Sequence, residues 1–86
     1  MSKAKKLLER FSLKPKDFTY DELKRLLKSF GYEEAKTGKT AGSRAAFINR
    51  ANMHIIRLHK PHPGNILKHY QLNSIEEELK RKGVIQ

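Results

Sequence analysis

The stretch that decides the fold is residues 43–59, SRAAFINRANMHIIRLH. Within it, Ser43–Asn49 and Met53–His59 predict two strands, and the short polar turn Asn49–Asn52 joins them. Strands joined by so short a connection are expected to be antiparallel, because parallel strands need a longer crossover. The centre of the chain is therefore predicted to be part of an antiparallel meander.

The second of these strands can face the core in either of two registers. Alternation places His54 and Ile56 on one face of the strand and Arg57 and His59 on the other. If the first pair faces the helices, His54 packs beneath them, and Arg57 and His59 share the solvent face. The opposite register would bury His59, and the sequence alone is compatible with both.

Helical patterns lie on both sides of the strands. Before them, Tyr20–Phe30 has apolar residues at helical spacing, and Thr19 with Glu22 forms a capping-box pattern at its start. After them, a helix is expected from about Leu72 to Lys82. A further amphipathic helix, Lys3–Phe11, opens the chain. Gly31 follows the helix at Tyr20–Phe30 and Gly83 follows the helix near the end of the chain, and each supplies a left-handed stop.

A first strand, Tyr32–Lys36, completes the order helix, helix, strand, strand, strand, helix. Apart from the N-terminal helix, this is an α-β-β-β-α pattern. It predicts an α+β domain in which a three-stranded antiparallel sheet carries helices on one face. The 86 residues are expected to form one domain, residues 1–86, with residues 1–16 as an N-terminal helical extension.

Charge is unevenly distributed along the chain. Lys and Arg number 19 against 9 Asp and Glu, for a net charge of +10, and no acid occurs from Ala35 to Ile75. Such a surface attracts a polyanion or an acidic protein partner, although a general bias toward solubility would give the same composition. The chain has no cysteine, no signal-like leader and no apolar run of the roughly 20 residues that span a bilayer. We expect a cytoplasmic protein that does not enter a membrane.

The motif LHKPHPG, residues 58–64, carries the clearest sign of chemistry. It places His59 and His62 on either side of Lys60, on a backbone stiffened by prolines. Histidine exchanges protons near neutral pH, and lysine offers a point charge for phosphate. The motif therefore favours chemistry on a phosphodiester, and we expect RNA as the substrate. Either histidine could instead have a purely structural role.

The order of these motifs resembles the HicA family of prokaryotic toxins. The resemblance covers about residues 19–85 and rests on Gly31 and Tyr32 after a helix, on Gly42 and Ser43 opening a strand, and on the 58–63 motif before the last helix. It implies a double-stranded-RNA-binding-like fold, ribonuclease activity on mRNA and an acidic HicB antitoxin as partner. We expect a protein that is monomeric alone and forms a hetero-oligomer with that antitoxin.

One position departs from the family pattern. HicA toxins usually have Gly-Ser-His-x-x-Phe, in which the histidine is catalytic, whereas this chain has Gly42, Ser43 and Arg44 followed by Phe47. Arginine stays protonated at physiological pH and cannot act as an ordinary general base. Either a histidine of the 58–64 motif transfers the proton, or the protein binds RNA without cutting it.

Metal-independent cleavage of RNA needs a base for the 2′-hydroxyl, an acid for the 5′-oxygen and a cation for the phosphoryl oxygens. His59 and His62 are the candidates for acid and base. The candidates for binding phosphate and the RNA backbone are Arg44, Lys60, Lys36, Lys39 and Arg57. No metal or other cofactor is expected, since these two histidines supply fewer ligands than a metal site needs. The alternatives are an RNA-binding module without catalysis and a domain that binds only an acidic partner.

Overall fold

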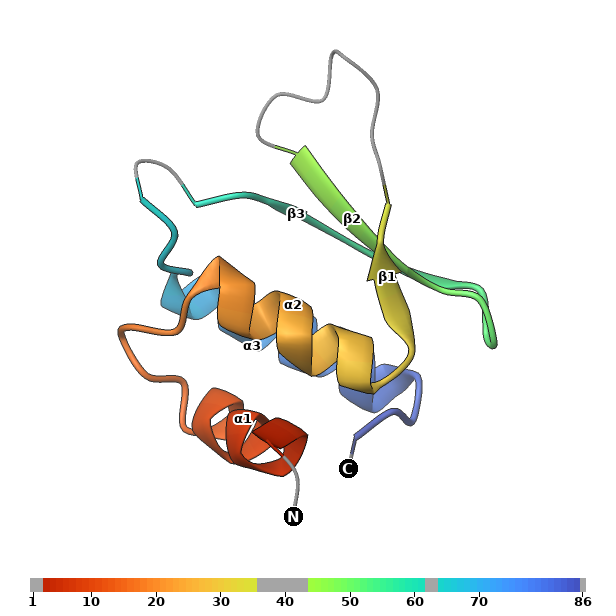
Figure 1. Ribbon diagram of the computed structural model, residues 1–86, viewed down its shortest axis with the longest axis horizontal. Coiled ribbons are helices and arrows are strands. Elements are labelled where there is room, and N and C mark those ends of the chain that lie inside the picture. The colour runs from red at the N-terminus through yellow and green to blue at the C-terminus, as the bar shows by residue number, and fades with distance from the viewer. Residues whose placement is uncertain (1–2, 36–43, 62–63, 86) are drawn as a thin grey trace.

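The elements of the fold follow one another in the expected order. The computed structural model describes residues 3–35, 44–61 and 64–85 (Figure 1). Its helices and strands are α1 (Lys3–Ser12), α2 (Tyr20–Ser29), β1 (Tyr32–Glu34), β2 (Arg44–Asn49), β3 (His54–His59) and α3 (His69–Arg81). This arrangement confirms the α+β prediction, α-β-β-β-α with an additional N-terminal helix. Among the described residues, no helix is long and apolar enough to cross a membrane.

The three strands form one antiparallel sheet in the order β1-β2-β3. In the hairpin of β2 and β3, Arg44 lies opposite His59 and Asn49 lies opposite His54. The turn between them is stabilised locally, because the Asn49 side chain accepts a hydrogen bond from the Ala51 amide at 2.9 Å. Both strands end where predicted, and β3 begins one residue after its predicted start; Ser43, the predicted start of β2, lies outside the described residues. The predicted β1 was longer, but its last residue, Lys36, lies outside the described residues.

Burial along the strands decides the register that the sequence left open. Phe47 on β2 and His54 and Ile56 on β3 are buried against the helices. Arg57 and His59, at the alternate positions of β3, are exposed. The first of the two registers is therefore correct, and His54 packs beneath the helices while His59 reaches solvent.

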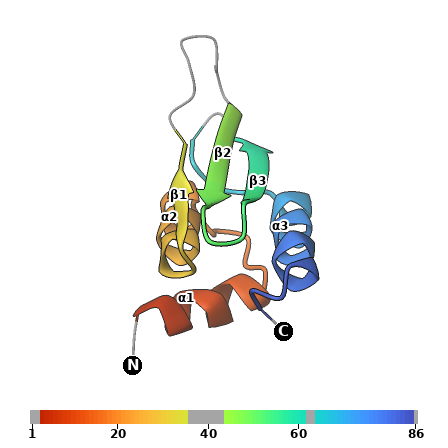
Figure 2. The ribbon, with the colours of Figure 1, turned by 90° about the vertical axis from the view of Figure 1, so that its right-hand side faces the viewer.

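Two helices cover the buried face of the sheet, α2 beside β1 and α3 beside β3 (Figure 2). The capping box of α2 is confirmed, since the Glu22 amide donates to Thr19 Oγ1 at 3.1 Å and the Thr19 amide donates to Glu22 Oε1 at 2.9 Å. The predicted start of α3 was wrong by three residues. The helix begins at His69 because the Gln71 side chain accepts a hydrogen bond from the Lys68 amide at 3.0 Å and so stabilises the first turn.

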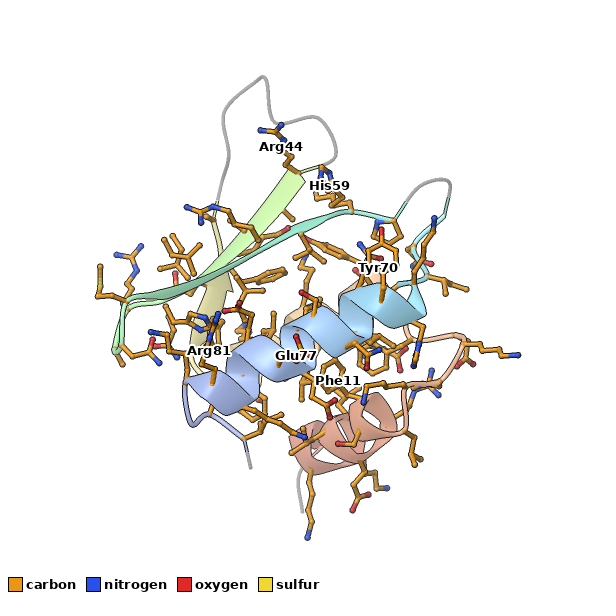
Figure 3. The ribbon with its side chains drawn as sticks, turned by 180° about the vertical axis from the view of Figure 1, so that it is seen from behind. Phe11, Arg44, His59, Tyr70, Glu77 and Arg81 are labelled. Atoms are coloured by element: carbon orange, nitrogen blue, oxygen red, sulfur yellow. The ribbon has the colours of Figure 1, made fainter. Side chains whose placement is uncertain are left out.

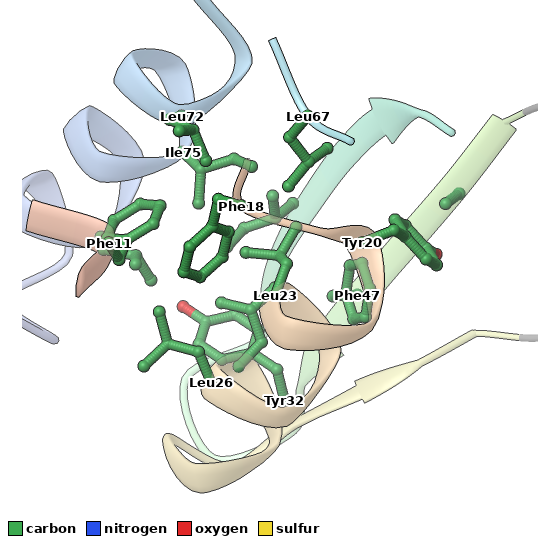
Figure 4. Packing of buried hydrophobic residues seen from close by; sticks show 14 residues of the cluster. Phe11, Phe18, Tyr20, Leu23, Leu26, Tyr32, Phe47, Leu67, Leu72 and Ile75 are labelled. Atoms are coloured by element: carbon green, nitrogen blue, oxygen red, sulfur yellow. The ribbon is translucent and has the colours of Figure 1, made fainter. Parts of the chain in front are cut away.

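Helix α1 packs on the helical layer, on the side away from the sheet (Figure 2). The Phe11 side chain is fully buried and meets Phe18 edge to face, with ring centroids 5.7 Å apart (Figure 4). Arg10 Nε donates to Glu22 Oε2 on α2 at 2.9 Å. After the helix, Lys14 Nζ lies 2.5 Å from a Glu76 carboxylate oxygen on α3. The N-terminal extension is therefore joined to both other helices by packing and by ion pairs.

One apolar core fills the space between the sheet and the helices. It includes residues from all three helices and all three strands, together with Phe18 and Leu67 from the connections (Figure 4). The segment after β3 runs antiparallel beside the start of α2, since the Tyr20 amide donates to the Asn65 carbonyl at 2.7 Å and the Leu67 amide donates to the Phe18 carbonyl at 2.8 Å. These bonds draw the segment that follows β3 back onto the domain.

Candidate functional site

The helices leave one face of the sheet uncovered, and a basic hollow lies on it where β2 starts and β3 ends. The hollow, of about 370 Å³, is named here the β2–β3 hollow. Its lining residues are Arg44, Ala45, Ala46, Arg57, Leu58 and His59. Strand alternation explains the basic members of this set, because Arg44, Arg57 and His59 all occupy outward positions.

The pairing of the strands places three site candidates at neighbouring positions on the outward face of the sheet. Arg44 and His59 are direct cross-strand partners (Figure 3). Arg57 pairs with Ala46, one diagonal step away. Directly opposite residues in an antiparallel pair have Cβ atoms about 4.5–5.5 Å apart, and diagonal neighbours are about 7–8 Å apart. The side chains of Arg44, Arg57 and His59 therefore line the same hollow from neighbouring positions.

A buried glutamine holds His59 in place from behind. The Gln71 side chain, only 8% exposed, donates through Nε2 to the His59 carbonyl at 2.8 Å. The same side chain caps the start of α3 through the Lys68 amide. The end of β3 and the start of α3 are thus fixed to each other. The sequence did not identify Gln71 as a residue that supports the site. Its one sequence signal is a polar side chain directly before Leu72, a position predicted to be buried.

Lys60 does not join the β2–β3 hollow. Its Nζ lies 5.8 Å above the centre of the Tyr20 ring on α2, on the helical side of the sheet. The Tyr20 hydroxyl donates to Glu34 at 2.5 Å, and Lys24 Nζ lies 3.3 Å from the same carboxylate. Burial acts to raise the pKa of Glu34, but the hydrogen bond from Tyr20 and the charges of Lys24 and Lys60 hold that pKa below its ordinary value. The neighbours of Lys60 are thus an aromatic ring and a carboxylate rather than Arg44.

A second histidine is buried and belongs to a structural network. The Tyr32 hydroxyl lies 2.6 Å from His54 Nδ1, and His54 Nε2 lies 2.8 Å from Glu78 Oε1. Glu78 also pairs with Arg81 one turn later on α3. The hydrogen bond from His54, followed by that from Arg81, lowers the pKa of Glu78. This network ties β1 and β3 to α3, and His54 is only 5% exposed.

The remaining predicted site residues are His62, Lys36 and Lys39, which lie outside the described residues. Within the part of the chain that the structure describes, no three histidine, aspartate or glutamate side chains are grouped so as to hold a metal ion. Of the acids on or beside the sheet, Glu34 contacts Tyr20 and Lys24, Glu78 contacts His54 and Arg81, and Glu33 is exposed on β1, at the opposite edge of the sheet from β3. The β2–β3 hollow is therefore lined by basic side chains whose charges these carboxylates do not pair.

Comparison with known families assigns the chain to a class of proteins. A family model described as the HicA toxin of bacterial toxin-antitoxin systems matches residues 20–84. Because the match covers most of the chain, the protein is a toxin of the toxin–antitoxin class, whose partner is an antitoxin. It belongs to the HicA family. Helix α1 lies outside the matched residues. No curated protein and no solved structure matched the chain.

Proposed function

We propose that this toxin binds RNA in the β2–β3 hollow and cleaves it without a metal ion. The observation that supports the proposal most directly is the convergence of Arg44, Arg57 and His59 on one exposed area of the sheet. Arginine binds two phosphate oxygens at once through its planar fork, and histidine is the usual carrier of protons near neutral pH. The net charge of +10 attracts the RNA backbone to this surface.

The proposed step is an attack of the ribose 2′-oxygen on the adjacent phosphorus. His59 takes the proton of the 2′-hydroxyl, a bond forms between the 2′-oxygen and phosphorus, and the bond to the 5′-oxygen breaks. A second donor, His62 or a water molecule, returns a proton to the departing 5′-oxygen. Arg44 and Arg57 bind the non-bridging oxygens, where negative charge accumulates. The products are a 2′,3′-cyclic phosphate and a free 5′-hydroxyl.

The test is cleavage of a labelled RNA in the presence of a chelator. We expect His59→Ala to lower the rate by about 10²-fold or more, the usual contribution of general acid–base catalysis. Arg50→Ala is the control, because Arg50 is also an exposed basic residue but lies outside the β2–β3 hollow. Circular dichroism checks that both variants fold. Absence of cutting by the wild type, or full activity of His59→Ala, would contradict the nuclease proposal.

Binding without cleavage is the second candidate function. It is favoured by Arg44, which stands where the family pattern has its catalytic histidine. The logarithm of the RNA affinity falls linearly with the logarithm of the salt concentration. Each phosphate contact that is lost should make this negative slope less steep by about 0.7–0.9. We expect that loss for Arg44→Ala and Arg57→Ala, and a smaller one for Arg50→Ala, an exposed arginine at the other end of β2. RNA affinity that hardly changes with salt would count against both candidate functions.

We also propose that an acidic, HicB-like antitoxin covers this basic surface in a hetero-oligomer. Opposite charges speed the association of two proteins, and added salt weakens the attraction between charged residues at the rim of their interface. Co-expression with the product of a neighbouring acidic reading frame should give a complex that elutes together. Arg57→Glu should weaken that complex, and Arg50→Glu, with the same charge change away from the β2–β3 hollow, should weaken it less. Equal effects of the two substitutions would show that the antitoxin binds elsewhere.

A further inference from the structure

One aromatic side chain stands apart from the core. The chain has three tyrosines, four phenylalanines and no tryptophan, and all of these residues are described. Six of the rings are buried or packed against the core, whereas Tyr70 is 66% exposed. Among the described residues, none hydrogen-bonds to its hydroxyl or stacks on its ring. A large apolar ring held in solvent by a helix serves no evident purpose in packing.

The position of Tyr70 relates it to the β2–β3 hollow. Its neighbour in the chain, Gln71, donates to the His59 carbonyl at 2.8 Å, so the first turn of α3 lies against the end of β3. One turn further along α3, Ser74 lines a second hollow together with Arg57. Figure 3 shows Tyr70 projecting from α3 toward the end of β3, with that strand end between the ring and His59. Tyr70 therefore lies across the end of the edge strand β3 from the β2–β3 hollow, and Arg57 lines hollows on both sides of that strand.

The surroundings of Tyr70 are basic. Lys68 and His69, which precede it, are both exposed, and Arg57 lies on the adjacent strand. An aromatic face beside a groove of positive charge is the arrangement that single-stranded nucleic acids recognise, because bases stack on the ring while phosphates meet the cations. The ring is held on a helix whose first turn is capped by Gln71, so it is presented by a rigid element.

We propose that Tyr70 is a stacking platform for one unpaired base of the RNA strand whose phosphate occupies the β2–β3 hollow. This inference rests on the proposed RNA binding and adds to it a base contact outside the hollow. Stacking requires a base with a free face, so the substrate class is single-stranded RNA or an unpaired loop. Because every base has a π face, Tyr70 contributes affinity and positions the strand rather than selecting a sequence.

The experiment measures binding of a fluorescent single-stranded RNA whose riboses carry 2′-O-methyl groups, which prevents cleavage. Stacking of one base contributes a factor of about 5 to 150 in affinity. We therefore expect Tyr70→Ala to weaken binding by such a factor and Tyr70→Phe to bind within about twofold of the wild type. Leu13→Ala is the control, because Leu13 is a large apolar residue, 82% exposed, that follows α1.

A set of oligonucleotides with one abasic position each makes the test specific for stacking. At one position, removing the base should weaken binding to the wild type by the factor expected for Tyr70→Ala. The same abasic oligonucleotide should bind Tyr70→Ala about as well as the complete oligonucleotide does. The inference is wrong if Tyr70→Ala binds like the wild type while Arg44→Ala is weakened, since RNA would then use the hollow without the ring. It is also wrong if Tyr70→Leu keeps full affinity. If the wild type binds none of the oligonucleotides, the proposed RNA binding itself fails.

Discussion

Replacing Phe11 with alanine should remove much of the stability of the whole domain, although α1 lies outside the residues matched by the family. The Phe11 side chain is fully buried and packs edge to face on Phe18. Truncation of a buried phenylalanine costs about 3–5 kcal/mol, which includes the lost burial and the cavity left behind. A chain of 86 residues is expected to have a free energy of unfolding of roughly 4–13 kcal/mol. The substitution therefore removes a quarter or more of that total.

The assay for Phe11→Ala is urea unfolding followed by circular dichroism. With a denaturant slope of about 1–3 kcal/mol per molar, the midpoint should fall by at least about 1 M. Leu13→Ala serves as the control, because this exposed residue should change stability by no more than about 0.5 kcal/mol. A cost below about 1 kcal/mol for Phe11→Ala would refute the reasoning, because α1 would then add little to the core.

Three further predictions concern the polar and backbone contacts of the fold. Tyr32→Phe removes the hydroxyl that meets buried His54 and should cost about 1–3 kcal/mol in urea unfolding; a cost near zero would contradict a role for that bond. Gly31→Ala should lower the melting temperature through a backbone cost of about 1–2 kcal/mol, because Gly31 has φ +95°; an unchanged melting temperature would mean the backbone relaxes. The hydrogen bond from Arg10 lowers the pKa of the Glu22 carboxyl in the folded protein. The stability that this pair contributes is therefore fully present above the pKa of about 4.3 that glutamate has in the unfolded chain, and it is lost as pH falls through the lower pKa of the folded state. Glu22→Gln should therefore show a flatter acid limb in a stability–pH profile, and an identical limb would rule out this contribution.

The elements that could be predicted from sequence are those whose cause is local. The capping box of Thr19 and Glu22 needs only residues three apart, and the left-handed stop at Gly31 needs only one residue. The hairpin of β2 and β3 follows from a short polar turn between two strand-like segments. The start of α3 could not be predicted in this way, because it depends on a Gln71 side chain whose other hydrogen bond goes to β3.

Residues of the candidate site were harder to place than the elements that carry them. Lys60 is adjacent to His59 in the chain, yet it lies over Tyr20 on the helical side of the sheet. Arg44 and His59 are fifteen residues apart in the chain and become direct partners through the strand register. Adjacency in sequence is therefore a poor guide to which side chains share a site on a strand, because successive residues point to opposite faces.

The sequence by itself determined the class of this protein: its basic charge, its order of helices and strands, and the motifs that resemble HicA toxins. These properties follow from composition and from spacing within single elements, so they can be read along the chain. Only the tertiary structure decided which face of the sheet is covered. That choice buries His54 in a network with Tyr32 and Glu78, and it sends His59 to the surface beside Arg44. The physical reason is that a strand offers two equivalent faces until helices bury one of them.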